Sequence, residues 1–277
     1  MVRDATFRSA FLRELLASAW RIAGDAAELV RAAARDRPRR DVRRKGEGDF
    51  VTAIDLRIER QVRDAVRARH PDHGFLGEES EPVRPDAEFV WVVDPIDGTS
   101  NFAQGLPEYA VSIACLSAGR PLVAAVHAEP RAEQFTAIAG TGAWRNGRRL
   151  RVEAAALSDA TVIGAQWMRA VHEPALLAAL SRSGARVRVF GSTVTQLCDV
   201  AVGRLHANVQ TQGRVWDLAA AALIAKEAGA IVSDWRGRPI LPFASLDPAL
   251  HHPSLVAAPG LHAELVERLP SRPARLR

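Results

Sequence analysis

The length, composition and charge of the chain exclude a membrane-spanning protein and a small disulfide-stapled one. It has 277 residues, 48% of them hydrophobic, which is enough for one large core or two closely packed ones. No apolar run reaches the ~20 residues that span a bilayer. The pI of 10.1 is typical of nucleic-acid binders. The net charge is only +5, however, because 32 acidic residues offset most of the 37 basic ones, and this disfavours that role.

The first predicted element is an amphipathic helix over residues 9–35. Its apolar residues recur at helical spacing, and Pro38 ends it. Arg8 and Arg13 interrupt any apolar segment near the N-terminus, so we expect no signal peptide.

Two cysteines, Cys115 and Cys198, lie in apolar surroundings. They are too few for a disulfide framework and lack the spacing of a zinc site. We therefore expect buried free thiols, as in a reducing compartment, and predict a cytoplasmic protein.

A basic stretch over residues 35–45 follows, and we predict a mobile loop there. Its position just before Asp49 leaves open a role in binding. A second helix is predicted from Thr52, because Thr52 and Asp55 have the spacing of a capping box, and Pro71 marks its end.

Strands dominate the next segment. Residues 88–93 predict a buried strand, and three runs over 109–117, 121–128 and 133–139 predict an antiparallel meander. A tight turn is expected at Asn146-Gly147.

After residue 157, predicted strands and helices alternate, which indicates α/β architecture. We expect an α+β half over residues 1–153, which carries most of the candidate metal ligands, and an α/β half over residues 154–277. The strands predicted in the second half cover residues 161–165, 186–190, 206–209, 230–232 and 254–258, and the helices cover residues 173–182, 193–203, 215–228 and 261–268.

A short acidic segment, Asp94-Pro95-Ile96-Asp97-Gly98-Thr99, follows the strand predicted at 88–93. If Pro95 helps to form a turn, the two carboxylates can converge with the Ile96 carbonyl between them. Oxygen donors without histidine or cysteine favour Mg²⁺ over zinc. Taken alone, however, the segment fits an Asp-Pro turn with Asp97 capping a helix better than it fits a metal site.

Other acidic residues also lie at the ends of predicted elements. Glu78 follows a short strand, Asp217 begins an alanine-rich helix, and Asp49 and Asp55 flank Val51-Thr52. Each has a simpler interpretation on its own, as a solvated acid, a helix N-cap or a capping box. Several such acids beside the segment that begins at Asp94 indicate one shared site.

These acidic segments belong to a longer series of motifs. At them the chain resembles the inositol monophosphatase family of metal-dependent phosphatases, and the resemblance covers nearly the whole chain. It implies a layered α/β/α/β/α fold like that of the sugar bisphosphatases. The matching motifs, in chain order, are DFVTAID at 49–55, GEES at 77–80, DPIDGTSNF at 94–102, GTGA at 140–143 with NG at 146–147, and WDLAA at 216–220 with EAGA at 227–230.

The resemblance also implies a centre for two to three Mg²⁺ ions. Matching positions place one ion on Glu78, Asp94 and the carbonyl of Ile96. They place a second ion on Asp94, Asp97 and Asp217, and Glu78 would share a weaker third ion.

The remaining site residues follow from the same resemblance. Asp55 and Thr99 match the pair that orients the attacking water, and the N–H groups of Gly98 and Thr99 would bind phosphate. Ser192 and Thr193 belong to the substrate loop. Inositol-type enzymes usually carry a glutamate seven residues before the Trp-Asp aspartate, and this chain has Gln210 there, which leaves the leaving alcohol open.

The activity implied is that of a phosphomonoesterase acting on inositol monophosphate or a similar polyol phosphate. Fructose 1,6-bisphosphate, histidinol phosphate and 3′-phosphoadenosine 5′-phosphate are alternative substrates. A regulatory RNA- or protein-binding module that keeps the fold is an alternative of another class, supported by the basic stretch 35–45. The resemblance further implies a homodimer, with a small phosphorylated substrate as its partner and no membrane contact.

Overall fold

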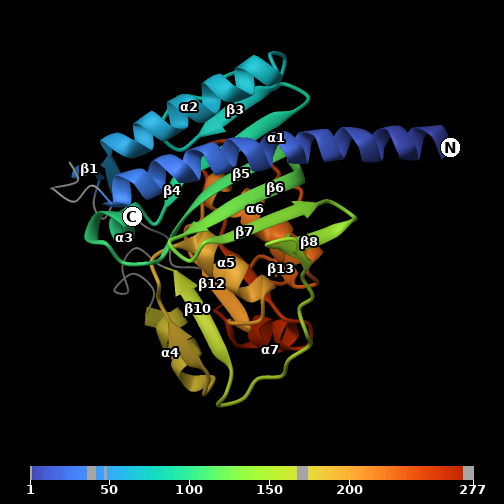
Figure 1. Cartoon of the computed structure of the whole chain (residues 1–277). Coiled ribbons are helices and arrows are strands. Elements are labelled where there is room, and N and C mark those ends of the chain that lie inside the picture. The colour runs from blue at the N-terminus through green and yellow to red at the C-terminus, as the bar shows by residue number, and fades with distance from the viewer. Residues whose placement is uncertain (1, 36–41, 47–48, 167–173, 271–277) are drawn as a thin grey trace.

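A computed structural model describes residues 2–35, 42–46, 49–166 and 174–270. Two large β-sheets and the helices around them form stacked layers (Figure 1), and a third sheet has two strands only. The helices are α1 (Val2–Arg35), α2 (Ala53–Arg69), α3 (Thr99–Gln104), α4 (Pro174–Arg182), α5 (Thr193–Ala201), α6 (Val215–Glu227) and α7 (Leu261–Arg268). The strands are β1 (Val42–Gly46), β2 (Asp49–Thr52), β3 (Gly74–Gly77), β4 (Val90–Asp97), β5 (Tyr109–Ser117), β6 (Arg120–Glu129), β7 (Glu133–Ile138), β8 (Gly142–Arg145), β9 (Arg148–Arg149), β10 (Val162–Gln166), β11 (Arg186–Arg188), β12 (Ala207–Gln210), β13 (Ile231–Ser233) and β14 (Ser254–Ala257).

The larger sheet has seven strands in the order β3-β4-β5-β6-β7-β8-β9. Only β3 and β4 pair in parallel, and the strands from β4 onward form the predicted antiparallel meander. The smaller sheet has five strands in the order β11-β10-β12-β14-β13, with parallel pairs on both sides of β10. The change from a meander to alternating strands and helices is therefore confirmed.

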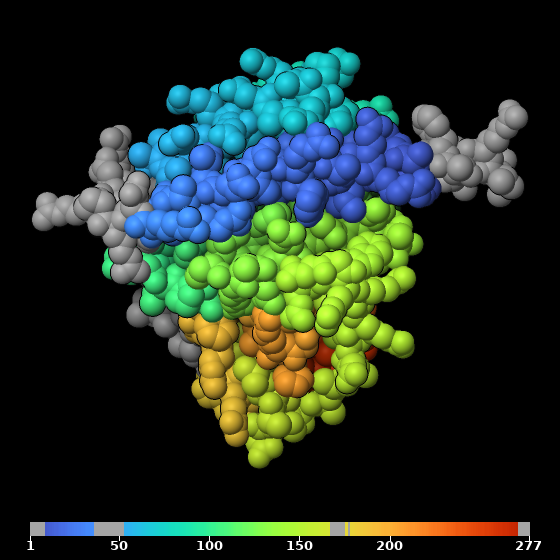
Figure 2. Space-filling view, in the orientation of Figure 1, coloured from blue at the N-terminus to red at the C-terminus, as the bar shows by residue number. Residues whose placement is uncertain are grey.

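Alternating side chains give each sheet two apolar faces. On one face of the seven-stranded sheet, side chains such as Trp91 and Ile113 pack against α1 and α2. In the space-filling view, α1 crosses the molecule between α2 and the strands (Figure 2). The opposite face packs on α5 and α6, which lie between the sheets. The five-stranded sheet packs its outer face on α4 and α7. The expected α/β/α/β/α layering is confirmed.

One prediction about the N-terminal segment is wrong. Residues 42–46 form strand β1 and are not the predicted loop, because their backbone groups pair with β2 in an antiparallel ladder. Residues 36–41 lie outside the described part of the chain. The first helix also begins at Val2, earlier than the predicted start at residue 9.

Cys115 and Cys198 are buried and free, as predicted. No helix in the described ranges is long and apolar enough to cross a membrane. The two halves proposed at 1–153 and 154–277 each supply one of the two large sheets, while the middle core draws side chains from both. Their division into separate units stays a prediction.

Candidate metal centre

Strand β4 carries both aspartates of the acidic segment, and both are buried. In a regular strand, residues three apart point to opposite faces of the sheet. Here the pairing with β5 shifts its register between Asp94, which faces Ser112, and Asp97, which faces Ala110. This irregularity lets the two carboxylates reach the same side.

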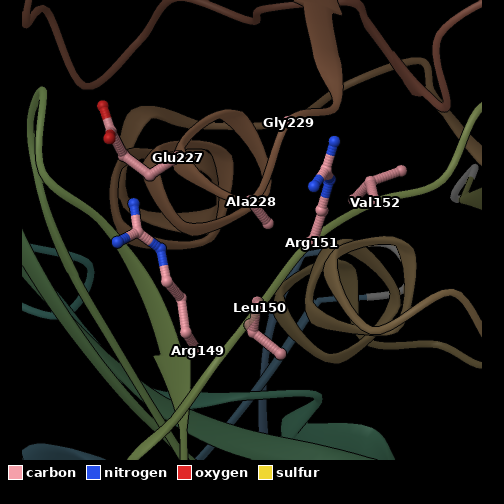
Figure 3. Close-up of a pocket in the computed structure, with 7 residues that line it drawn as sticks. All are labelled: Arg149, Leu150, Arg151, Val152, Glu227, Ala228 and Gly229. Carbon is pink, nitrogen blue, oxygen red and sulfur yellow. The ribbon is translucent and has the colours of Figure 1, made fainter.

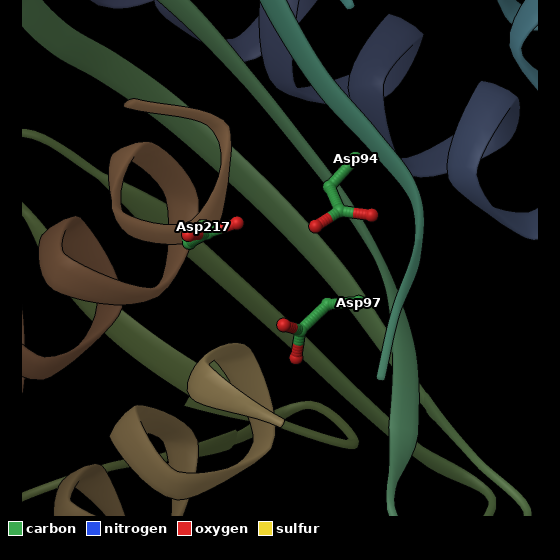
Figure 4. A group of neighbouring side chains, drawn as sticks. All are labelled: Asp94, Asp97 and Asp217. Atoms are coloured by element: carbon green, nitrogen blue, oxygen red, sulfur yellow. The ribbon is translucent and has the colours of Figure 1, made fainter. Parts of the chain in front are cut away.

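A third aspartate comes from the other half of the chain. Asp217 lies in the first turn of α6 and accepts a hydrogen bond of 2.7 Å from the backbone N–H of Arg214. Asp94, Asp97 and Asp217 each have one carboxylate oxygen within 4.8 Å of an oxygen of the other two. Figure 4 shows the three side chains around a common space, from β4 and from the helix α6.

The electrostatics of this cluster oppose three bare negative charges. Burial raises the pKa of Asp94 well above its ordinary value, and the nearby charges of Glu78, Asp97 and Asp217 raise it further. Burial also raises the pKa of Asp97 to about 6, although hydrogen bonds from Ser192 and from backbone N–H groups of α5 work in the opposite direction. Oδ1 of Asp94 is buried and has no hydrogen-bond partner among the described residues.

A hard divalent cation fits this site. A buried carboxylate oxygen with no partner is costly, and a cation would offset both that cost and the mutual repulsion. The cluster of Asp94, Asp97 and Asp217 offers oxygen donors alone, which suits Mg²⁺ better than zinc.

Glu78 follows β3 directly, and its charge is close enough to raise the pKa of Asp94. It therefore lies beside the cluster, as predicted from its motif. The side chain of Asp49 lies outside the described part. Glu59, which the sequence analysis missed, is buried on α2 and accepts the backbone N–H of Glu79 at 2.7 Å. Its place one turn after Asp55 on the apolar side of α2 was the available signal.

The predicted water-orienting pair also lies together. Thr99, the first residue of α3, has its hydroxyl 3.1 Å from Oδ1 of Asp55 and 2.9 Å from the carbonyl of Ile96. Asp55 is fully buried on α2. Gly98 has φ +86°, and a Cβ there would lie 2.6 Å from the carbonyl of Glu108, so only glycine fits before Thr99.

The start of α5 wraps the carboxylate of Asp97. The hydroxyl of Ser192 donates a short hydrogen bond to Asp97, and the backbone N–H groups of Val194 and Thr193 approach it at 2.9 and 3.2 Å. The Nε2 group of Gln210 donates to Oγ1 of Thr193 at 2.8 Å. Oε1 of Gln210 is buried without a hydrogen-bond partner in the described part of the chain.

A separate surface pocket of about 630 Å³ lies between the segment after β9 and the end of α6 (Figure 3). Arg149, Arg151 and Glu227 are among its lining residues, and none of the predicted site residues is. The predicted site residues therefore lie outside this pocket.

The layered fold and the buried aspartate cluster are those of an α/β protein that can hold a metal ion. Comparison with known proteins shows the family: the chain belongs to the inositol monophosphatase family, whose model matches residues 12–272. A relative called "Nus factor SuhB" from Salmonella typhimurium is 40% identical over 199 residues, 70% of this chain and 74% of the relative. The solved structure of the extragenic suppressor protein suhB from Bartonella henselae has a TM-score of 0.81 at 28% identity and covers 94% of this chain and 98% of that one. The inositol monophosphatase from Anabaena has a TM-score of 0.79 at 27% identity, covering 93% and 95%.

Proposed function

We propose that this protein is a Mg²⁺-dependent phosphomonoesterase that hydrolyses inositol monophosphate or a similar polyol phosphate. The observation that carries the proposal is the convergence of Asp94, Asp97 and Asp217 beside the hydrogen-bonded pair of Asp55 and Thr99. Membership of the inositol monophosphatase family supports it.

In this proposal, Glu78, Asp94 and the Ile96 carbonyl would hold one ion. Asp94, Asp97 and Asp217 would hold a second, and Glu78 would share a third. When bound, such cations lower the pKa of the attacking water and neutralise charge on the leaving alcohol.

The protein's own part in proton transfer is set by Thr99. Its hydroxyl donates toward Asp55 or the Ile96 carbonyl, so its oxygen is left to accept. A water held beside Thr99 therefore donates a hydrogen to that oxygen and turns a lone pair toward the phosphorus. The ionised carboxylate of Asp55 and the carbonyl of Ile96 can only accept, which makes the Thr99 hydroxyl the donor to either of them.

Phosphate binding is proposed for the backbone N–H groups of Gly98 and Thr99. Ser192, Thr193 and Gln210 lie at the place proposed for the leaving alcohol. Oε1 of Gln210 can accept a hydrogen bond from a neutral hydroxyl. This neutral amide supports a polyol phosphate over a substrate with a cationic group at that position.

The test is release of inorganic phosphate from four substrates: inositol 1-phosphate, fructose 1,6-bisphosphate, histidinol phosphate and 3′-phosphoadenosine 5′-phosphate. We expect the highest kcat/KM with inositol 1-phosphate in Mg²⁺ and no turnover with excess chelator. A preference for another ester would change the substrate but keep the chemistry. No turnover on any phosphate ester would overturn the proposed activity.

The alternative function is that of a regulatory protein that binds RNA or another protein. Its support is that relatives of this chain are called "Nus factor SuhB". Tight RNA binding that weakens steeply with salt, in a wild-type protein without turnover, would select it over the enzyme. We also propose, from the family resemblance, that the protein works as a cytoplasmic homodimer.

A further inference from the structure

A network of ion pairs links α5 with the segment just before β5 and the turn between β6 and β7. Arg131, in the turn between β6 and β7, donates to Oδ1 of Asp199 at 2.8 Å and also bonds Oε2 of Glu108. Asp199 lies on α5, and Glu108 lies just before β5. A single guanidinium therefore joins two segments that are 91 residues apart in the chain, since Asp199 and Glu108 are separated by 199 − 108 positions.

Each of these two segments touches the candidate metal centre. The backbone carbonyl of Glu108 lies against Gly98, where a Cβ would be only 2.6 Å away. The same carbonyl accepts a hydrogen bond of 2.8 Å from Asn101. Asp199 lies on the helix whose N-terminal groups hold the carboxylate of Asp97. Arg131 thus lies outside the site but contacts the two segments that shape it.

We propose that Arg131 is a positioning residue for the metal centre. It fixes α5 relative to the segment Gly98–Thr99, and thereby fixes the orientation of the Asp97 carboxylate. Two features make it suited to this. Its planar guanidinium bonds two carboxylates at once, and its side chain is only 20% exposed, which limits screening by solvent.

The fold does not depend on Arg131 alone. Arg204 also donates to Oδ1 of Asp199, at 2.9 Å. Removing Arg131 therefore leaves the buried carboxylate of Asp199 with one guanidinium partner. We expect an Arg131 variant to fold, but with the carboxylate of Asp97 no longer held in a fixed orientation.

The experiment compares Arg131→Met, Arg131→Lys and the control Arg145→Met in the full-length protein. Arg145 bonds Glu133 at 3.1 Å in the same region, and no hydrogen bond or ion pair of the described residues joins it to Asp199 or Glu108. The first readout is Mn²⁺ affinity by calorimetry, which needs no turnover. The second is kcat at saturating metal, which rests on the proposed phosphatase function.

We expect Arg131→Met to weaken Mn²⁺ binding by about tenfold and to lower kcat by a similar factor, with KM changed less, as for other residues that orient metal ligands. Arg131→Lys should recover part of both, because lysine keeps the charge but lacks the two-pronged geometry. Arg145→Met should match wild type in both. If wild type shows no turnover, the phosphatase function fails, while the calorimetry still tests Arg131. Wild-type Mn²⁺ affinity in a folded Arg131→Met protein would overturn the proposal. If that variant does not fold, Arg131→Lys with wild-type affinity and kcat would overturn it.

Discussion

Two groups of buried or half-buried carboxylates differ in the partners that the protein provides for them. Glu108, Glu133 and Asp199 are bonded to the guanidinium groups of Arg131 and Arg204. Within the described ranges, neither Asp94 nor Asp97 forms an ion pair with a basic side chain.

The pKa values follow this difference at Glu133 but not at Glu108. Hydrogen bonding to Arg204 lowers the pKa of Glu133, whereas burial raises the pKa of Asp94 and Asp97, and also that of Glu108 despite its bond to Arg131. Residue type alone therefore does not mark a functional site. A site for an external cation is marked by acids that the protein has gathered and has not neutralised itself.

The largest expected effect comes from the cluster of Asp94, Asp97 and Asp217. Asp94→Asn should lower kcat/KM by roughly a thousandfold or more, equivalent to about 4 kcal/mol of transition-state stabilisation. In chelator at pH 8 the same variant should unfold at a higher temperature than wild type, because it removes a repelled buried charge. Phosphate release and thermal unfolding measure the two effects.

The matched variant in the paired group is Glu133→Gln. It should unfold at a lower temperature than wild type, because it breaks the ion pair with Arg204. Equal and same-signed stability changes in Asp94→Asn and Glu133→Gln would break the comparison.

A second effect, of about 3 kcal/mol, concerns a buried base without a partner. Both ring nitrogens of His127 lack hydrogen bonds within the described residues, and burial, aided by Arg31 on α1, lowers its pKa to about 4. Glu129, two residues along β6, bonds Arg31, and the cross-strand neighbours Val111 and Gln134 are uncharged.

A depressed histidine pKa means that stability is fully present above pH 6.5 and is lost as the pH falls toward 4, by about 3 kcal/mol. His127→Leu should be free of this loss. Urea unfolding of both proteins at pH 7 and pH 4.5 measures it. If the free energy of unfolding changed equally with pH in both proteins, the pKa of His127 would not be lowered by folding.

A third effect separates binding of the cation from use of the water. Thr99→Val should lower kcat by roughly a hundredfold while Mg²⁺ affinity stays near wild type, because the change removes the hydroxyl that accepts from water. Thr99→Ser, which keeps the hydroxyl, is the control and should retain most of the activity. A Thr99→Val protein with wild-type kcat would contradict the role given to this pair.

The smallest effect is on choice of substrate. Gln210→Glu places a charge where Gln210 now donates to Thr193. It should shift the ratio of kcat/KM values between inositol 1-phosphate and the other esters by about tenfold, the usual scale for one polar contact. An unchanged ratio would show that Gln210 does not face the substrate.

The order of elements could be predicted because it depends on local patterns, and the meander follows from alternation. The acids of the site, taken one by one, fitted turns and helix caps better, and their assignment as metal ligands came from the family resemblance and stays a prediction. Strand β1 was missed because its sequence has no alternating apolar pattern. It is a strand because its backbone pairs with β2. Arg131 was missed for a related reason, since its partners Asp199 and Glu108 are distant in the chain.

Calorimetric titration of the metal-free protein with Mg²⁺ at pH 8 tests the central claim most directly. We predict saturable binding to the wild type, no measurable binding to Asp94→Asn, and wild-type binding to an Asp64→Asn control, since Asp64 is an exposed acid on α2. Equal binding by wild type and Asp94→Asn would show that the gathered aspartates are not a cation site.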